Sequence, residues 1–349
     1  MISIMSSPVG SILGHECQVF YLNKLLGKGT FAHAYLFHGP AHVGKLTVAK
    51  LLASALHCSA KPQILEAVCN ECDVCRRIDE GVYPEVWIVD PKHSLVSAKD
   101  KRRDIPIEDI RELKRLLSFA PVKDCWRVAI INEAERLSQE AANSFLKLLE
   151  EPGARTLFIL ITDSPELVPL TIRSRVQPVR FSLVPRKRLE AFLARPARVS
   201  SDGAREGIAA PLREELLLLS RGRPGLLLEF IRDEARLRKE QSQYRRVAQT
   251  IGGLPSTTIG GSSGSAIFDF VEALPDDEED RQQVMEYAFG AMHSDVLSRV
   301  TRQESVQPQL ALLKRFDEIL TLMATTNVNQ RLALEVALLT AWRCMRAHY

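Results

Sequence analysis

The sequence predicts a P-loop α/β domain with a zinc-binding module, followed by two helical domains. The first observation is the loop from Gly39 to Lys45, which has the glycine and lysine spacing of a loop that cradles phosphates. The second is the alternation of short apolar runs with helical patterns as far as residue 181, which is typical of a parallel sheet covered by helices on both faces. The third is a group of four cysteines between residues 58 and 75.

The predicted strands and helices follow one another in the order that a phosphate-binding loop requires. An apolar run leads into Gly39, and the helix after Lys45 carries an apolar stripe. Ser138 can cap a later helix, which Pro152 ends. The predicted strands are 34–38, 84–89, 127–131 and 157–162, and the predicted helices of this part are 47–57, 107–118 and 139–151.

Helical patterns replace strand-like runs in the second half of the chain. Residues 252–265 are rich in Gly, Ser and Thr, a composition typical of a flexible linker. We therefore predict four segments, which are the α/β domain at 1–183 with its zinc module at 58–75, a small helical domain at 184–251, the linker at 252–265 and a helical C-terminal domain at 266–349.

The loop residues offer a phosphate site but lack the groups that hold magnesium. Gly39 and Gly44 let backbone amides turn toward a phosphate, and Lys45 adds a positive charge. In such sites magnesium is held by a Ser or Thr directly after the lysine and by an acid at the tip of a later strand. Those two positions are Leu46 and Asn132.

Two neighbouring polar residues do not replace the missing magnesium ligands. Thr47 lies one residue too late, about 100° around the helix, and Glu133 could orient a water but has no well-held metal to act on. We therefore expect no ATP hydrolysis by the chain itself, whereas weak binding of ADP or phosphate at Lys45 stays open. The degenerate nucleotide site consists of Gly39, Gly44, Lys45, Thr47, Asn132 and Glu133.

Four cysteines have the spacing of a structural zinc site. Three form a CxxCxxC run, and the fourth lies upstream at the end of the helix after the loop. Four thiolates complete a tetrahedral zinc shell and leave no open position for a substrate, so the predicted zinc is structural. The alternatives are buried free thiols and His57 as a competing ligand. The predicted ligands are Cys58, Cys69, Cys72 and Cys75.

An arginine follows the last predicted strand. The segment from Thr171 to Arg175 is expected at the edge of the α/β domain. An arginine there can reach the phosphates of a nucleotide bound by a neighbouring subunit, since its planar fork matches the charge that spreads in phosphoryl transfer. A surface salt bridge is the alternative interpretation. The residues alone leave both open.

The bulk properties favour a cytoplasmic protein that does not grip DNA by itself. The net charge of the 349 residues is +3 without an obvious basic stripe, and the charge run at 99–103 is typical of a solvated loop. No apolar run approaches the ~20 residues of a membrane span, and the N-terminus does not have the pattern of a secretion signal. We therefore expect no membrane partner.

With these residues assembled, the chain resembles the bacterial clamp-loader subunits of the AAA+ class, and most closely the delta-prime subunit family of DNA polymerase III. The resemblance covers residues 14–181, and more loosely 185–250. It is carried by the segment at 32–37 before the loop, the four cysteines, the segments at 134–137 and 141–152, and Ser174-Arg175.

The resemblance implies an AAA+ fold with a helical lid at 184–251 and a collar at 266–349 that holds a ring of subunits together. It implies a pentameric hetero-oligomer that opens a sliding clamp and closes it on primed-template DNA, with subunits of the gamma/tau and delta type as partners. In this family a Ser-Arg-Cys motif lends its arginine across a subunit interface. Here the motif is Ser174-Arg175-Val176, so the arginine is kept and the cysteine is lost.

The missing magnesium ligands and the retained arginine together predict a stator. This is a clamp-loader subunit of the bacterial replicative polymerase that does not hydrolyse ATP but supplies Arg175 as a trans arginine finger to a neighbouring ATPase. Its expected cofactor is structural zinc. A role for ATP or ADP bound at the chain's own loop is not expected. Two alternatives stay open: an active clamp-loader ATPase of the gamma/tau type, and a zinc-stabilised adaptor of the AAA+ fold outside replication.

Overall fold

The computed structural model describes two compact units of the chain, Met1–Arg232 and Asp233–Tyr349. Each unit is considered by itself. Most of the predicted linker at 252–265 and the charge run at 99–103 lie outside the described residues. The described residues are 12–346 except 63, 93–94, 97–103, 120–124, 195–208, 252–264, 275–277 and 326–328.

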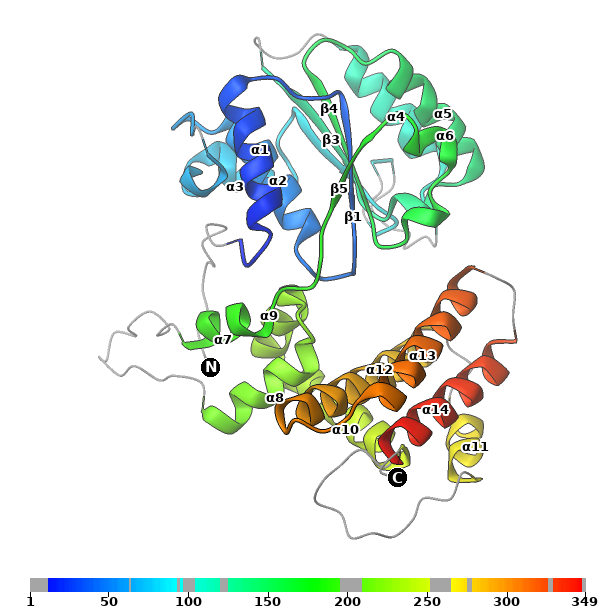
Figure 1. The fold of residues 1–349 in the computed structure, drawn as a ribbon. Helices are drawn as coiled ribbons and strands as arrows, with labels where there is room; N and C mark the ends of the chain where they lie inside the picture. Colours follow the sequence, from blue (N-terminus) through cyan, green and yellow to red (C-terminus); the bar gives the residue numbers. More distant parts are fainter. Residues whose placement is uncertain are drawn as a thin grey trace. The chain divides into compact units, whose positions relative to one another are not determined.

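The first unit is built on a parallel five-stranded sheet with the strand order β2-β3-β4-β1-β5 (Figure 1). Its strands are β1 (Ala34–His38), β2 (Val86–Val89), β3 (Arg127–Ile131), β4 (Thr156–Thr162) and β5 (Gln177–Arg180). The parallel α/β sheet and the four predicted strands are confirmed. All residues of β3 and β4 are buried, as expected for central strands with helices on both faces.

The fifth strand was missed by the sequence analysis. Of its four residues only Val179 is buried, and Pro178 is a residue that sheets accept mainly at their edges. β5 is a strand because it pairs with the edge of β1, from Tyr35 opposite Gln177 to His38 opposite Arg180. This long-range pairing, and not a local preference, determines its conformation.

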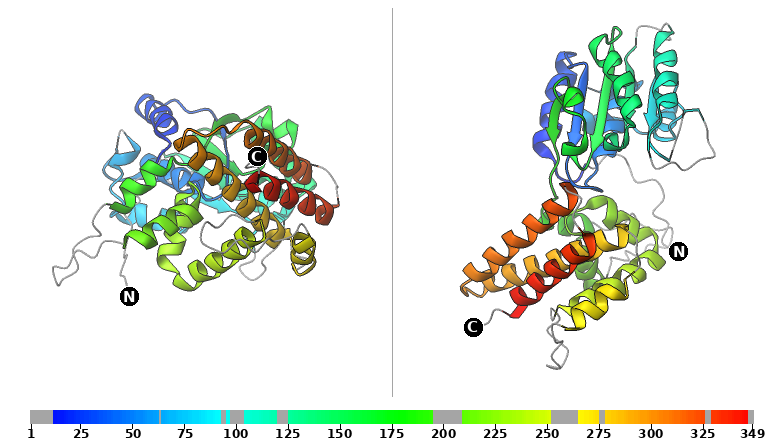
Figure 2. Two further views of the ribbon diagram at one scale, coloured as in Figure 1. Left: turned by 60° about the horizontal axis from the view of Figure 1, so that its bottom comes forward. Right: turned by 90° about the vertical axis from the view of Figure 1, so that its right-hand side faces the viewer.

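Helices cover both faces of the sheet (Figures 1 and 2). Separate clusters of buried side chains join each helical layer to the sheet, so the core has one half on each face. One layer contains α1 (Glu16–Lys28), α2 (Lys45–His57) and α3 (Asp73–Asp79), and the other contains α4 (Ile107–Ser118), α5 (Gln139–Glu150) and α6 (Leu170–Arg173). Short 3₁₀ helices are η1 (Leu65–Ala67), η2 (Ala134–Arg136) and η3 (Pro165–Leu167).

The described residues of the first unit contain three further helices, namely α7 (Arg186–Ala194), α8 (Ala210–Ser220) and α9 (Pro224–Arg232). A close backbone contact fixes them to the chain that leaves β5. The N–H of Val184 donates to the carbonyl oxygen of Gly222 at 2.8 Å. Gly222 has a φ of 78°, and a Cβ there would lie 2.9 Å from the carbonyl oxygen of Val184, so this approach requires glycine.

Every helix or strand in the described residues of the second unit is a helix, as the sequence pattern predicts. Its helices are α10 (Glu234–Thr250), α11 (Ser265–Glu272), α12 (Glu278–Thr301), α13 (Gln307–Thr325) and α14 (Gln330–Arg346). α12, α13 and α14 pack against one another, while α10 packs on α12 and α11 packs on α14 (Figure 2). Large buried side chains such as Tyr287 and Phe316 fill the space between these helices.

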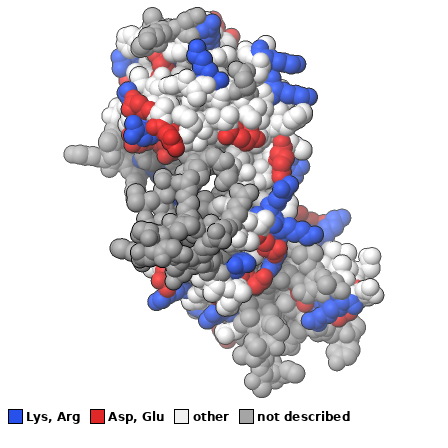
Figure 3. All heavy atoms as spheres, turned by 90° about the vertical axis from the view of Figure 1, so that its left-hand side faces the viewer, with Lys and Arg blue, Asp and Glu red and all other residues white. Residues whose placement is uncertain are grey.

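The described helices and the surface charge bear on membrane and nucleic-acid binding. No helix of the described residues has the length and apolar character that crossing a membrane requires. On the face drawn in Figure 3, Lys and Arg side chains are interspersed with Asp and Glu side chains. This mixture agrees with the net charge of +3 and gives that face no single electrostatic sign.

A buried arginine ties the end of α4 to the central strands. Arg127 is only 7% exposed, and its guanidinium donates to the carbonyl oxygen of Leu117 at 2.5 Å and to Thr156 Oγ1 at 3.1 Å. Leu117 lies in the last turn of α4, where helix carbonyls have no partner within the helix. Arg127 therefore satisfies polar groups that would otherwise be buried without a hydrogen bond.

Replacing Arg127 by methionine should lower the free energy of unfolding of the first unit by about 2–4 kcal/mol, because the buried acceptors lose their donor. Arg111→Met removes an exposed arginine of α4 and should change the stability by less than about 0.5 kcal/mol. Urea denaturation followed by tryptophan fluorescence measures both. Equal stability of the two variants would contradict the role given to Arg127.

Candidate functional site

The loop between β1 and α2 is a tight turn that requires both of its predicted glycines. Gly39 and Gly44 have φ angles of 139° and 106°, in the region that side chains rarely adopt. A Cβ at Gly39 would also lie 2.1 Å from the carbonyl oxygen of Phe181, so no side chain fits there. Lys45 follows as the first residue of α2 and is 7% exposed.

The ammonium group of Lys45 is bound by groups of its own chain. Its Nζ donates to the carbonyl oxygens of Gly39 at 2.5 Å and Pro40 at 2.7 Å. Burial lowers the pKa of Lys45 from its ordinary value, and the negative charges of Asp163 and Glu135 act in the opposite direction. These two carboxylates therefore lie close enough to Lys45 to act on its charge.

The two magnesium positions contain neither an acid nor a hydroxyl. Leu46 packs against the core cluster on the α2 face of the sheet. Asn132 directly follows β3, as predicted, and carries no charge. Thr47 is exposed, and Glu133 is engaged with Arg136, whose Nε lies 3.0 Å from its Oε2. The two positions that would hold magnesium therefore offer neither a carboxylate nor a hydroxyl.

Two carboxylates near the lysine were missed by the sequence analysis. Asp163 follows β4, and Glu135 lies on η2 beyond the end of β3. Burial raises the pKa of Glu135 to about 7, against a hydrogen bond from Thr162, and Asp163 adds to the rise. The position of Asp163 directly after a predicted strand was a usable sequence signal, because the carboxyl ends of neighbouring parallel strands meet at one edge of the sheet. Glu135 lies beyond its strand, where the pattern gives no such signal.

The loop is covered by α9 and by the segment before α1. The N–H of Gly225 donates to the carbonyl oxygen of His42 at 2.8 Å, and a Cβ at Gly225 would lie 2.8 Å from the same oxygen. His42 Nδ1 lies 3.6 Å from Glu229 Oε1. His15 Nε2 lies 3.0 Å from the carbonyl oxygen of Val43. The outer side of the loop is thus packed against two other parts of the first unit.

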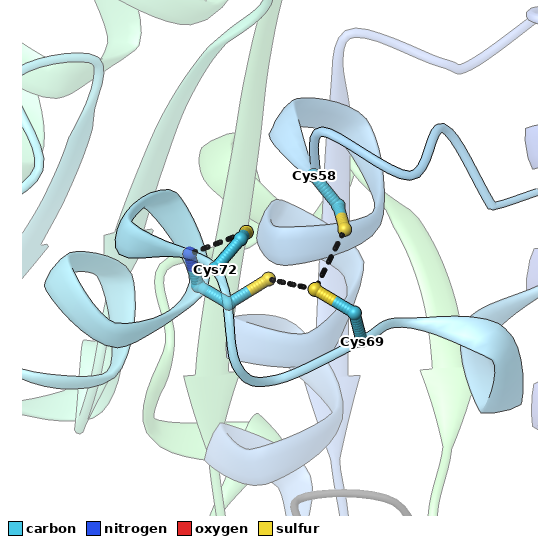
Figure 4. Close-up of side chains that lie close together, drawn as sticks. Cys58, Cys69 and Cys72 are labelled. Atoms are coloured by element: carbon cyan, nitrogen blue, oxygen red, sulfur yellow. Dashed lines mark hydrogen bonds between the residues drawn. The ribbon is translucent and has the colours of Figure 1, made fainter.

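The four predicted cysteines come together beside α2. Their Sγ atoms all lie within 4.8 Å of one another, and Cys58 and Cys69 are 3.4 Å apart. Figure 4 shows Cys58 at the end of α2 and Cys69 and Cys72 on the chain that leads to α3. Cys75 is buried in α3, and its Sγ lies 3.9 Å from that of Cys69.

This group of thiols suits a tetrahedral metal ion. Four sulfurs at ~2.3 Å from zinc lie about 3.8 Å from one another, which is close to the observed spacing. Burial raises the pKa of the Cys72 thiol, but hydrogen bonds from backbone amides and neighbouring thiols outweigh burial and lower this pKa to about 6. His57 does not compete, because its ring nitrogens lie 2.8 and 2.7 Å from the carbonyl oxygens of Ala53 and Trp126. The cluster could hold a metal ion.

Arg175 lies at the surface just after α6. Its side chain is 39% exposed, and its Nη2 lies 2.8 Å from Glu150 Oε1 at the end of α5. Its Nη1 donates to the carbonyl oxygen of Thr171 at 3.1 Å. The surface salt bridge expected as one interpretation is present, and the guanidinium remains accessible to a partner as the other interpretation requires.

Comparison with known proteins relates the N-terminal half of the chain to DNA polymerase III. Residues 14–185 match the family model described as DNA polymerase III, delta subunit. The chain is 36% identical over 173 residues to the tau subunit of Bacillus subtilis, covering 50% of this chain and 29% of that protein. It is 33% identical over 184 residues to the gamma/tau subunit of Mycobacterium tuberculosis, covering 53% and 30%.

The gamma subunit of Buchnera aphidicola from Acyrthosiphon pisum is 30% identical over 182 residues, which are 52% of this chain and 47% of that protein. The chain thus spans less than half the length of these curated relatives. A solved gamma-subunit-related protein of Thermotoga maritima aligns with 94% of this chain and 100% of its own, at 19% identity and a TM-score of 0.37. That score is too low to support an argument. The relatives are of the gamma/tau type and do not single out the delta-prime type.

Proposed function

We propose that this chain, whose residues 14–185 are of the DNA polymerase III subunit type, is a clamp-loader subunit of the delta-prime type and the AAA+ class. In this role it helps to load the sliding clamp onto primed DNA. It hydrolyses no ATP of its own and supplies Arg175 to ATP bound by a neighbouring subunit. It is the stator of the assembly, which completes a catalytic site elsewhere.

One observation carries this proposal: an exposed Arg175 is retained in a chain that has neither magnesium ligand. Leu46 packs into the core, and Asn132 is uncharged. Phosphoryl transfer relies on a metal ion that bridges the phosphates and neutralises the developing charge, so the chain's own loop is poorly equipped for it. An arginine that acts across an interface depends instead on the neighbour's metal and nucleotide.

The mechanism assigns the guanidinium of Arg175 to the triphosphate of the neighbour. Charge spreads over the γ-phosphate oxygens in the transition state, and the planar fork can donate two parallel hydrogen bonds to them. In the isolated chain Glu150 orients this fork through an exposed salt bridge. Such a pair contributes at most ~1 kcal/mol, so Arg175 can exchange it for phosphate at little cost.

The partners of this proposal are subunits of the gamma/tau and delta type, the sliding clamp and primed-template DNA, in a cytoplasmic bacterial hetero-oligomer. The names of the relatives support a place among polymerase III subunits. In this assignment the helical segment at 184–251 is the lid, and the helices of 266–349 form the collar that joins the subunits. The net charge of +3 favours DNA contact through the whole assembly and not through this chain alone.

In the same proposal Cys58, Cys69, Cys72 and Cys75 bind a structural zinc ion. A closed shell of four thiolates leaves no coordination position for a substrate. The cluster joins the end of α2 to α3, so the ion would stabilise the helix that begins at the phosphate loop. Zinc therefore supports the fold and takes no part in nucleotide chemistry.

The chain purified without chelator should contain about one zinc ion, and Cys72→Ser should lose it because three thiolates hold zinc less tightly than four. The same variant should melt at a lower temperature. Cys17→Ser changes an exposed cysteine outside the cluster and should alter neither property. Metal analysis by mass spectrometry and thermal denaturation give the two readouts. A chelated wild type that melts like the untreated protein would refute a structural role.

In a reconstituted clamp loader, Arg175→Ala should slow ATP hydrolysis at the neighbouring site, because the transition state loses its guanidinium. Arginine fingers in other systems contribute ~10³–10⁵-fold, so turnover at that site should fall by at least tenfold. Steady-state ATPase and clamp-loading assays on the assembled complex measure the loss.

Two controls accompany this variant. Size-exclusion chromatography should show that the Arg175→Ala complex assembles normally, and Arg76→Ala, which removes an exposed arginine near the cysteine cluster, should leave ATPase unchanged. Unchanged turnover and clamp loading with Arg175→Ala in an intact complex would remove the trans role. Failure of the chain to assemble with any clamp-loader subunit would favour the adaptor outside replication.

The similarity to gamma and tau subunits favours a second candidate, an active clamp-loader ATPase. The two candidates differ in the isolated chain. Under the stator proposal the pure chain should show no magnesium-dependent ATPase above background, and Lys45→Ala should change nothing. A magnesium-dependent rate that Lys45→Ala abolishes would establish the second candidate in its place.

A further inference from the structure

A cavity of about 690 Å³ lies at the end of the sheet and takes no part in the proposed trans role. It is lined by His38 at the end of β1, Arg180 at the end of β5 and Asp163 directly after β4. These three strands are neighbours in the sheet (Figure 1). Because ligands of parallel α/β sheets bind outside the carboxyl ends of the strands, the cavity lies where such folds hold a ligand.

The cavity is on the other face of the sheet from α2. Phe37 and Val179 belong to the cluster of buried side chains on the α2 side. Since successive side chains of a strand point to opposite faces, His38 and Arg180 are directed away from α2. Only the first two residues of the loop line the cavity, and Lys45 does not. A ligand of this cavity would therefore not occupy the phosphate position of the loop.

Arg180 brings a positive charge to the cavity that is not paired with a carboxylate. Its guanidinium makes neither an ion pair nor a hydrogen bond with any residue that the structure describes. Its Cα lies opposite that of His38 in the pairing of β1 with β5, so the two side chains are on the same face. Burial, and then the charges of Arg180 and Lys45, lower the pKa of His38. This side of the cavity is therefore suited to an anion.

Ser182 adds neutral hydrogen-bond donors to the same lining. It lies two positions after β5, and neither its hydroxyl nor its backbone N–H has a hydrogen-bond partner among the described residues. The planar fork of a guanidinium matches a tetrahedral oxyanion, and hydroxyl and amide donors can bind its further oxygens. Arg180 and Ser182 together thus provide the donors that one oxyanion needs.

Asp163 makes the cavity selective among oxyanions. A carboxylate repels an anion without protons, but it can accept a hydrogen bond from an anion that keeps a proton. At about pH 8 inorganic phosphate keeps a proton, whereas sulfate and phosphate monoesters are fully ionised. The lining therefore favours a phosphate ion that still carries a hydrogen over these other oxyanions.

We propose that this cavity binds inorganic phosphate in its protonated form, hydrogen phosphate. The guanidinium of Arg180 and the donors of Ser182 bind the ionised oxygens, and Asp163 accepts the hydrogen bond of the P–OH group. The cavity is larger than the ion, so water molecules complete its contacts. The site does not depend on the trans role of Arg175, which is measured only in the assembled complex.

Isothermal titration calorimetry of the full chain at about pH 8 tests the proposal with phosphate, sulfate and glycerol 3-phosphate as probes. Wild type should bind phosphate about tenfold more tightly than either of the other two anions, and Arg180→Gln should weaken phosphate binding at least about tenfold. Asp163→Asn should bind phosphate and sulfate about equally, because the repulsion of the proton-free ion is removed.

The matched control is Lys187→Gln, which removes the same charge from an exposed position of α7 and should leave phosphate affinity unchanged. Circular dichroism verifies the fold of each variant. Absence of phosphate binding by wild type, or equal affinity of Arg180→Gln and wild type, would overturn the proposal. So would loss of phosphate binding in Lys45→Ala, because the ion would then lie on the loop.

A second readout places the ion in the cavity. Phosphate should raise the pKa of His38, because a nearby negative charge favours the protonated imidazole. NMR of the histidine ring protons across a pH series measures the shift, and His38→Gln assigns the signal. Arg180→Gln should remove most of the rise. A pKa of His38 that is the same with and without saturating phosphate would contradict the site.

Discussion

The first unit depends on the close packing of the loop between β1 and α2 against the chain that leaves β5. Gly39 approaches the carbonyl oxygen of Phe181 so closely that a Cβ would lie 2.1 Å from it. The N–H of Phe181 in turn donates to the carbonyl oxygen of His38 at 2.7 Å. The N–H of Gly39 donates to the carbonyl oxygen of Thr162 at 3.3 Å. Because the N–H of Val184 then donates to the carbonyl oxygen of Gly222, the chain that leaves β5 is also joined to the turn between α8 and α9. The loop is therefore a structural joint, whatever it binds.

Local sequence patterns predicted the parts of the fold whose signals are contained within a few residues. The loop glycines, the apolar runs of β1 to β4 and the cysteine spacing are of this kind, and Ser138 caps α5 through Ala141 as expected. β5 escaped because its three exposed residues, one of which is Pro178, resemble a loop, and only pairing with β1 makes it a strand. Glu135 escaped because its raised pKa arises from burial, which the sequence does not display.

Arg175 can form a surface salt bridge in the separate chain and still contact a neighbour's phosphate, because the salt bridge is the weaker of the two interactions. Its salt bridge to Glu150 joins side chains that are 39% and 51% exposed, so water screens the attraction. A triphosphate in a closed interface presents several charges at low dielectric, where each hydrogen bond is stronger. Under the proposed trans role, the carboxylate would hold the guanidinium in place in the separate chain and release it on assembly. Glu150 then limits the number of conformations that Arg175 must give up when it meets a phosphate.

A loop that is satisfied internally also constrains motion. In nucleotide-driven proteins the ligand shifts a conformational equilibrium by binding one state more tightly than another. Here the ammonium of Lys45 donates to the carbonyl oxygens of Gly39 and Pro40, and the N–H of Gly225 in α9 donates to that of His42. If nothing binds the loop, no differential affinity exists to move α9 away from it. Under the stator proposal, such a subunit would keep one arrangement through the cycle of its neighbours.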